Sequence, residues 1–208
     1  ISGPRGVGKA TMARWWSARL KCRDGDDCRG LCASCKRVAA GSHPDLCLVN
    51  VPEDKKHIGI DPVRRAATEM AIKPVAAGPR VAIIDPANQM TTEAQSAILK
   101  LLEEPPGWAV IVLVTDNPAS LLPTIRSRCQ RVRFGRLPAP VLDDILAAHD
   151  LDPGDVPRGR VDVFLEQRDA VDRMLEVGPV DVVVEVRVAV EAPHAQSLAA
   201  LVVFGDER

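Results

Sequence analysis

The residues with the clearest chemical potential stand at the start of the chain, where Gly3-Pro-Arg-Gly-Val-Gly-Lys9 fits the pattern G-x-x-x-x-G-K. In such a loop the backbone N–H groups and the start of the next helix surround phosphate oxygens, and the lysine reaches the outer phosphates. An apolar run ending in Asp85 fits a second loop element that holds a metal ion beside those phosphates. The candidate nucleotide-binding residues are Gly3, Gly6, Gly8, Lys9 and Asp85.

Four cysteines form a second candidate site. Cys22, Cys28, Cys32 and Cys35 are spaced as C-x5-C-x3-C-x2-C. Four thiolates within fourteen residues can close around one tetrahedral Zn²⁺, and the final C-x2-C is the usual half of a zinc knuckle. Disulfides are a less favoured alternative, because nothing in the sequence indicates export, and uncoordinated thiols are another.

Six segments occur in a recognisable order. They are GPRGVGKAT at 3–11, the cysteine cluster, SHPDL at 42–46, VAIIDPANQMT at 81–91, AILKLLEEPP at 97–106 and LLPTIRSRCQ at 121–130. This order resembles the bacterial clamp-loader subunits of the AAA+ family over about residues 1–150. Within that family the chain resembles the delta-prime type of DNA polymerase III more than the gamma/tau motor type, because it reads Ile84-Asp85-Pro86, Lys9-Ala10 and HPDL.

The resemblance makes two departures informative. Ala10 stands where a Ser or Thr hydroxyl would coordinate Mg²⁺, and Thr11 is rotated by about 100° further around the helix. Pro86 stands where the family carries the carboxylate that polarises the attacking water, and proline supplies neither a base nor a hydrogen-bond donor. We therefore expect no useful ATP hydrolysis by this chain alone. Nucleotide binding stays open, beside the alternative of a residual turn that merely begins a helix.

Arg128, within Ser127-Arg128-Cys129, matches an arginine that the family projects into the ATP site of a neighbouring subunit. There it stabilises the charge that develops on the transferred phosphoryl group, as an arginine finger in trans. From the residues alone, a solvated arginine beside an edge strand is the plainer interpretation, since Arg131-Val-Arg133-Phe alternates. Asp116 or Asn117, which follow Thr115 at a family sensor position, are expected to cap the next helix.

The resemblance also implies cofactors and partners. It implies a structural Zn²⁺ at the cysteine cluster, although the x5 and x3 spacings depart from the family's usual pattern. The implied partners are the gamma/tau and delta subunits and the sliding clamp, with DNA contacted through the complex, in the bacterial cytoplasm and without a membrane. The expected function is structural support of ATP-dependent clamp loading during replication. The alternatives are an active gamma/tau-type ATPase and a truncated, inactive fragment of delta-prime.

Alternating helices and strands must position these residues. Period and capping signals predict helices at Lys9–Lys21, Asp61–Ile72 and Thr91–Glu103, and apolar runs predict strands at Asp45–Val51, Arg80–Asp85 and Val110–Thr115. This alternation predicts an α/β fold with a parallel sheet flanked by helices, like an AAA+ phosphate-loop NTPase. Residues 1–137 are the expected core, with the zinc module at 22–35 and the first strand largely missing, because Ile1 and Ser2 alone precede the loop.

Composition divides the chain at about residue 140. Residues 1–140 contain 21 Lys and Arg against 13 Asp and Glu, whereas residues 141–208 contain 6 against 15. Residues 138–150 are expected to start a lid-like helical region, with a helix at Val141–His149, and residues 151–208 form an unassigned acidic, valine-rich tail with a strand-like run at Val180–Glu191. The chain has 3% aromatic residues, so no stacking platform for single-stranded nucleic acid is expected.

Overall fold

A parallel three-stranded sheet forms the centre of the computed structural model, which describes residues 1–5, 7–24, 28 and 30–135. The strands β1 (Leu46–Val49), β2 (Arg80–Ile84) and β3 (Ala109–Leu113) stand in the order β1-β2-β3. Leu46 pairs with Val81, and Val81 pairs with Val110. The predicted α/β class is confirmed, and the elements predicted at 141–149 and 180–191 lie outside the described residues.

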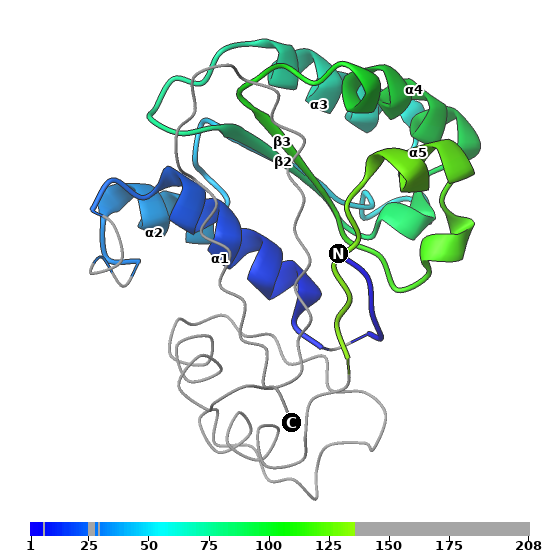
Figure 1. The fold of residues 1–208 in the computed structure, drawn as a ribbon, viewed down its shortest axis with the longest axis horizontal. Coiled ribbons are helices and arrows are strands. Elements are labelled where there is room, and N and C mark those ends of the chain that lie inside the picture. The colour runs from blue at the N-terminus through cyan, green and yellow to red at the C-terminus, as the bar shows by residue number, and fades with distance from the viewer. Residues whose placement is uncertain (6, 25–27, 29, 136–208) are drawn as a thin grey trace, which may run out of the picture.

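Helices cover both faces of the sheet (Figure 1). On one face lie α1 (Lys9–Lys21) and α2 (Ala33–Ala39). On the other face lie α3 (Ile60–Ala71), α4 (Thr92–Glu103) and α5 (Pro123–Arg128). Two short 3₁₀ helices, η2 (Ala87–Gln89) and η3 (Pro118–Ser120), follow β2 and β3. Within the described ranges, no helix has the length and apolar character to cross a membrane.

Alternating side chains of the strands supply two separate cores. In β2, Val81 and Ile83 pack in a cluster with α1 and α2, whereas Ile84 packs in the larger cluster with α3, α4 and α5. Val112 and Leu113 divide between the same two clusters in β3. A strand with apolar residues on both faces is expected in a parallel sheet covered on both sides. The continuous apolar runs of the sequence are therefore explained by this two-sided burial.

The first three residues lie between β3 and the segment 132–134. Ser2 forms parallel bridges with Thr115 and with Arg133. Its amide donates to the carbonyl of Val132 at 2.8 Å, and the amide of Phe134 donates back to the carbonyl of Ser2 at 2.7 Å. Gly3 follows at a close approach, because a Cβ there would lie 2.4 Å from the carbonyl oxygen of Phe134. The short stretch before the phosphate loop thus continues the sheet beyond β3.

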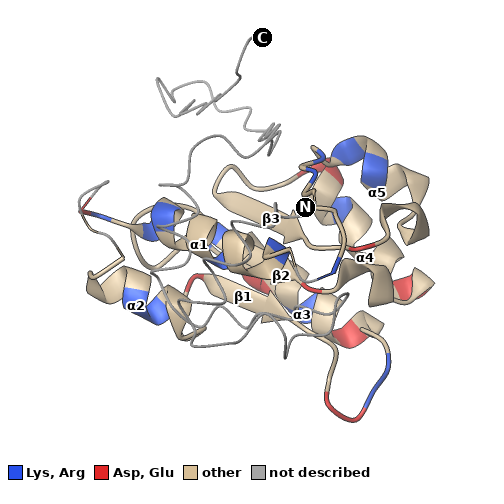
Figure 2. Ribbon diagram, turned by 90° about the horizontal axis from the view of Figure 1, so that it is seen from below, with Lys and Arg blue, Asp and Glu red and all other residues tan. Residues whose placement is uncertain are grey.

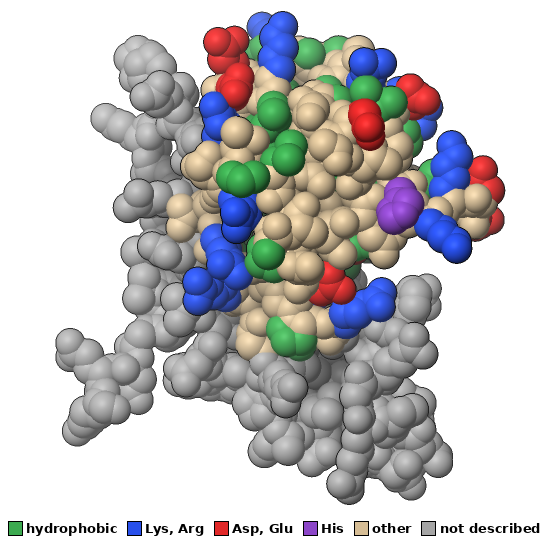
Figure 3. Space-filling model, turned by 90° about the vertical axis from the view of Figure 1, so that its right-hand side faces the viewer, with side chains coloured by type: hydrophobic (Ala, Val, Ile, Leu, Met, Phe, Trp, Pro, Cys, Tyr) green, Lys and Arg blue, Asp and Glu red, His purple; other side chains and the backbone are tan. Residues whose placement is uncertain are grey.

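Charged residues are distributed over several elements rather than along one stripe. Figure 2 shows Lys and Arg on α1, α2 and α5. In Figure 3, which views the molecule from the right of Figure 1, small groups of apolar, basic and acidic side chains alternate. A nucleic-acid-binding surface usually gathers its basic side chains on one face or along one helix. On the face seen in Figure 3, apolar and acidic side chains interrupt the basic ones.

Candidate functional site

The segment that fits the phosphate-loop motif lies between the first residues of the chain and α1. Gly8 is the N-cap of α1 and has φ +78, a left-handed conformation that favours glycine. The Nζ of Lys9 donates to the carbonyl oxygens of Gly3, at 2.9 Å, and of Pro4. Lys9 therefore bridges its own loop, while Gly6 lies outside the described residues. These hydrogen bonds hold the ammonium group against the first residues of the loop.

Two carboxylates surround this lysine at the ends of the strands. Burial lowers the pKa of Lys9, and the charges of Asp116 and Asp85 oppose that shift. Burial likewise raises the pKa of Asp85, against the charges of Lys9 and Arg14. Asp116 also pairs with Arg5 of the loop at 3.5 Å. The charges of Lys9 and Asp85 thus act on each other, and Asp116 adds a third charge that the motif did not include.

At the positions where the motif would place hydrolytic groups, the structure shows other residues and other contacts. Ala10 lies in the first turn of α1, and Pro86 is the N-cap of η2. At the end of β3, the Oγ1 of Thr115 donates to Asn88 at 3.1 Å and accepts from the amide of Asn117 at 3.1 Å. The side chain of Asn117 accepts from the amide of Ala119, so its predicted role as a helix cap is confirmed.

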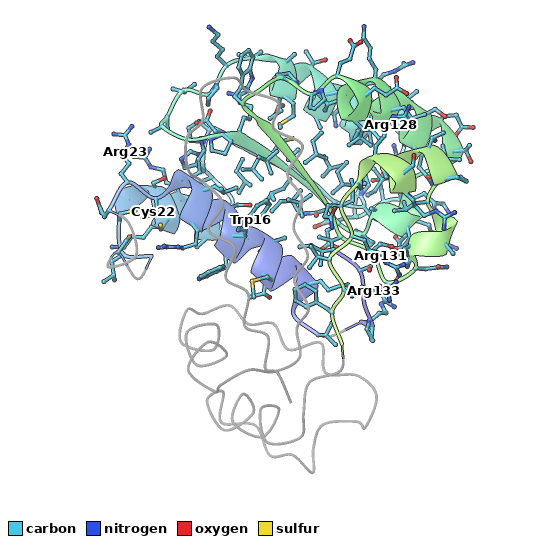
Figure 4. The ribbon with its side chains drawn as sticks, in the orientation of Figure 1. Trp16, Cys22, Arg23, Arg128, Arg131 and Arg133 are labelled. Atoms are coloured by element: carbon cyan, nitrogen blue, oxygen red, sulfur yellow. The ribbon has the colours of Figure 1, made fainter. Side chains whose placement is uncertain are left out.

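Arg128 is the last residue of α5 and is exposed at the right of the molecule in Figure 4. Its NH1 donates to the carbonyl of Thr124 at 3.1 Å, and its NH2 lies 2.8 Å from Oε1 of Glu103. The helix below it is firmly anchored, because Ile125 is fully buried in the larger core. Arg131 and Arg133 are also exposed and flank the buried Val132, which is the alternation that the sequence predicted.

A buried glutamine fixes the start of this helix. The Oε1 of Gln95 accepts from the amide of Leu122, the N-cap of α5, at 2.8 Å. Its Nε2 donates to the carbonyls of Ser120 and Met90, each at 3.3 Å. Because a buried amide is costly to leave unpaired, these bonds hold α4 and α5 in one relative position. Gln95 could not be selected from the sequence, since a lone glutamine on a helix carries no motif.

The four cysteines converge as predicted. The Sγ atoms of Cys22, Cys28, Cys32 and Cys35 all lie within 4.8 Å of one another. Zn–S bonds of about 2.3 Å in a tetrahedron require sulfur separations of about 3.8 Å, and Cys28 and Cys35 are 3.9 Å apart. The amides of Cys32 and Cys35 donate to the sulfurs of Cys28 and Cys32, each at 3.4 Å. This donor set can hold a metal ion.

The electrostatic surroundings differ among the cysteines of the cluster. The amide of Cys32 and the neighbouring thiols lower the pKa of Cys28 to about 6, whereas burial raises the pKa of Cys35. With a metal ion bound, both cysteines would be thiolates despite this difference in pKa, because each coordinated cysteine is bound as its thiolate. Cys47 and Cys129 are half-buried against the larger core and are not part of the cluster.

A buried ion network lies beside the cysteine cluster. Asp45 is 1% exposed and pairs with Lys21 at 2.8 Å and with Arg80 at 3.1 Å. Its carboxylate also accepts from the amides of Val75, at 2.8 Å, and Ala76, at 2.9 Å. Burial alone would raise the pKa of Asp45, but these hydrogen bonds hold it well below its usual range. The network joins the end of α1 to the starts of β1 and β2.

Residues 1–138 match the family described as "DNA polymerase III, delta subunit". The chain belongs to this family. It is 39% identical over 131 residues to a DNA polymerase III subunit delta' of Pseudomonas aeruginosa, a match that covers 62% of this chain and 40% of the relative. The predicted resemblance to bacterial clamp-loader subunits is confirmed.

Both subunit types named in the sequence analysis are among the relatives. The chain is 32% identical over 193 residues to subunit delta' of Bacillus subtilis, covering 85% of this chain and 58% of the relative. It is 35% identical over 149 residues to subunit gamma/tau of Mycobacterium tuberculosis, covering 71% of this chain and 26% of the relative. The chain thus spans between about a quarter and three fifths of the length of these relatives.

Proposed function

We propose that this chain is a non-hydrolysing, delta-prime-type subunit of a bacterial DNA polymerase III clamp loader. In this function it supports the ATP-dependent loading of a sliding clamp, and it supplies Arg128 to the ATP site of an adjacent subunit. Its partners are the gamma/tau and delta subunits and the clamp, in the cytoplasm, and it meets DNA through the assembly. The family match and the names of the relatives support this assignment.

The placement of Arg128 is the observation that carries the proposal. A residue that completes a neighbour's ATP site must be exposed, and it must lie on an element that keeps its conformation when the neighbour docks. Arg128 is exposed at the end of α5, while Ile125 and the bonds from Gln95 anchor that helix. A guanidinium presented in this way can stabilise the charge on a phosphoryl group in transfer.

The chain's own loop supports the non-hydrolysing part of the proposal. Ala10 offers no oxygen to a metal ion, and Pro86 offers no carboxylate to a water molecule. The loop keeps Lys9, whose positive charge favours phosphate binding, and Asp85, a candidate metal ligand, without the groups that complete hydrolysis. The same composition suits a subunit that assists a neighbour's reaction.

We further propose that the cysteine cluster holds one structural Zn²⁺. The four thiolates would complete a closed coordination shell, leaving no open position for a substrate, which is typical of structural zinc sites. The cluster is tied to the core because Ser34 donates to the carbonyl of Lys21 at 2.9 Å. The metal would therefore fix the loop between α1 and α2.

Replacement of Arg128 tests the arginine finger. Arg128→Ala should lower turnover at the adjacent ATP site of the assembled clamp loader by on the order of 10³-fold, as for other arginine fingers. Arg126→Ala is the matched control, since Arg126 is exposed on the same helix and its side chain makes no ion pair or hydrogen bond within the described ranges. Equal, small effects of the two substitutions would refute the assignment.

An active gamma/tau-type ATPase is the second candidate, favoured by the gamma/tau relative and by the retained Lys9 and Asp85. The two candidates differ in the isolated chain. Steady-state ATP hydrolysis by the isolated chain should stay at the background rate that is measured for Lys9→Ala. A turnover that Lys9→Ala abolishes would establish the motor-type function instead.

A further inference from the structure

The guanidinium of Arg128 is fixed from two directions by groups on two helices. NH1 donates to the carbonyl of Thr124, within α5, and NH2 pairs with Glu103, the last residue of α4. Two contacts to different nitrogens define both the position and the plane of a guanidinium, which a single contact cannot do. The orientation of Arg128 is therefore set within its own subunit before any neighbour is present.

Stability of the fold does not explain the Glu103 contact. The side chains of Arg128 and Glu103 are 36% and 47% exposed, and exposed ion pairs contribute little to folding. Glu103 also stands at the C-terminal end of α4, where the helix dipole disfavours a negative charge. A carboxylate in this position is better explained by what it does to the arginine than by what it does to the helix.

Packing and hydrogen bonds between α4 and α5 fix the relative position of the two helices that carry this pair. Gln95 of α4 binds both the N-cap amide of α5 and the carbonyl of Ser120. Apolar residues of both helices, including Ile98 and Ile125, are buried in one core cluster. Glu103 thus keeps a fixed place relative to α5, as a group that orients another side chain must.

We propose that Glu103 is a positioning residue for Arg128, which holds the guanidinium ready for the ATP site of the neighbouring subunit. The inference rests on the proposed arginine finger and assigns a residue that acts through it. An ordered arginine loses less conformational freedom when the reacting phosphoryl group engages it, so Glu103 contributes to turnover rather than to nucleotide binding.

The test compares Glu103→Gln with Glu104→Gln in the assembled clamp loader. Gln keeps the length of the side chain and an acceptor oxygen but removes the charge, and Glu104 is its exposed neighbour, with no side-chain ion pair or hydrogen bond in the part of the chain that the structure describes. Glu103→Gln should lower kcat of ATP hydrolysis by about two- to five-fold, the range expected for loss of an exposed pair, with KM for ATP unchanged. Glu104→Gln should match the wild type.

A double-mutant cycle separates the inference from the function on which it rests. In an Arg128→Ala background, Glu103→Gln should have no further effect on kcat, because its partner is already absent. If Arg128→Ala alone leaves the assembled ATPase unchanged, the proposed arginine finger fails. If Arg128→Ala lowers turnover but Glu103→Gln does not, the finger stands and the positioning role is overturned. An increase in kcat with Glu103→Gln would likewise overturn it, by showing that Glu103 restrains the arginine.

Discussion

Two arginine–carboxylate pairs in this molecule have similar lengths and opposite surroundings. Arg80 pairs with Asp45 at 3.1 Å, with side chains 9% and 0% exposed. Arg128 pairs with Glu103 at 2.8 Å, with side chains 36% and 47% exposed. Figure 4 places Cys22, which directly follows Lys21 of the buried network, and Arg128 on opposite sides of the molecule. The same chemical contact therefore occurs in two regions with different physical consequences.

The difference in physical consequence follows from how much of its hydration each pair loses on folding. The buried carboxylate of Asp45 gave up its hydration and replaced it with two cations and two amides, so removal of any partner leaves charges without compensation. The exposed pair kept water on much of its surface, so it contributes little to the stability of the fold. The first arrangement suits a structural role, and the second suits an arginine that must meet a neighbour.

The largest expected effect is at Asp45. Asp45→Asn keeps the shape of the side chain but leaves Lys21 and Arg80 buried without their anion, and it should lower the free energy of unfolding by about 3–5 kcal/mol. Chemical denaturation of the 208-residue chain measures this loss. Asp54→Asn, at an exposed position, is the control and should stay within about 0.5 kcal/mol of the wild type. A similar stability for both variants would remove the distinction between the two regions.

Zinc removal should have the next largest effect and should act at the buried region. A metal at 100 times its Kd contributes about 2.7 kcal/mol to stability, so a strong chelator should lower Tm measurably. Cys35→Ser should contain no stoichiometric zinc and should show no shift with chelator. Cys47→Ser, outside the cluster, should retain one zinc per chain in elemental analysis. Full wild-type stability of a zinc-free chain would contradict the structural role of the metal.

Acid should weaken the buried region in two steps. His43 is buried and its Nδ1 accepts from the amide of Asp45 at 3.1 Å, and burial with the charge of Lys21 lowers the pKa of His43. The unfolded chain then binds more protons below about pH 6.5, so stability should fall from there as the pH decreases. The lowered pKa of Asp45 adds a further loss below about pH 4.

Urea denaturation at several pH values measures this dependence. His43→Gln should reduce the loss of stability between pH 7 and pH 5, because the buried titrating group is gone. His57→Gln, at an exposed histidine, should leave the wild-type dependence in place. If both variants follow the wild type, the acid sensitivity does not arise from the buried region.

Much of the fold could be predicted because the signals are local. Apolar runs located the three strands, and the periodicity of Lys9–Lys21 and Thr91–Glu103 located two helices. The start of α3 was less accurate: Asp61 was expected near the cap, whereas the helix begins at Ile60 after Gly59. The reason is tertiary, since Ile58 exchanges backbone hydrogen bonds with Gln89 and Thr91 and so fixes the chain just before the helix.

The candidate sites likewise include features that the sequence predicts and contacts that it does not. Motif spacing was sufficient to predict that the four cysteines gather. It did not predict the partners of Arg128 or Asp45, because Glu103 and Arg80 lie 25 and 35 positions away in the chain and meet them only through the packing of α4 on α5 and β1 on β2. The HPDL segment did not reveal these partners, since a charged residue before an apolar strand requires a partner only when it is buried.

The smallest expected effect is on the free energy of unfolding when the exposed pair is removed. Glu103→Ala should change the free energy of unfolding by no more than about 0.5 kcal/mol, because water replaces the lost contact on both side chains. Denaturation beside Asp45→Asn under the same conditions gives the ratio of the two effects. A loss from Glu103→Ala comparable to that from Asp45→Asn would mean that the pair holds α4 and α5 together. Arg128 would then have to break a structural contact in order to reach a neighbouring subunit.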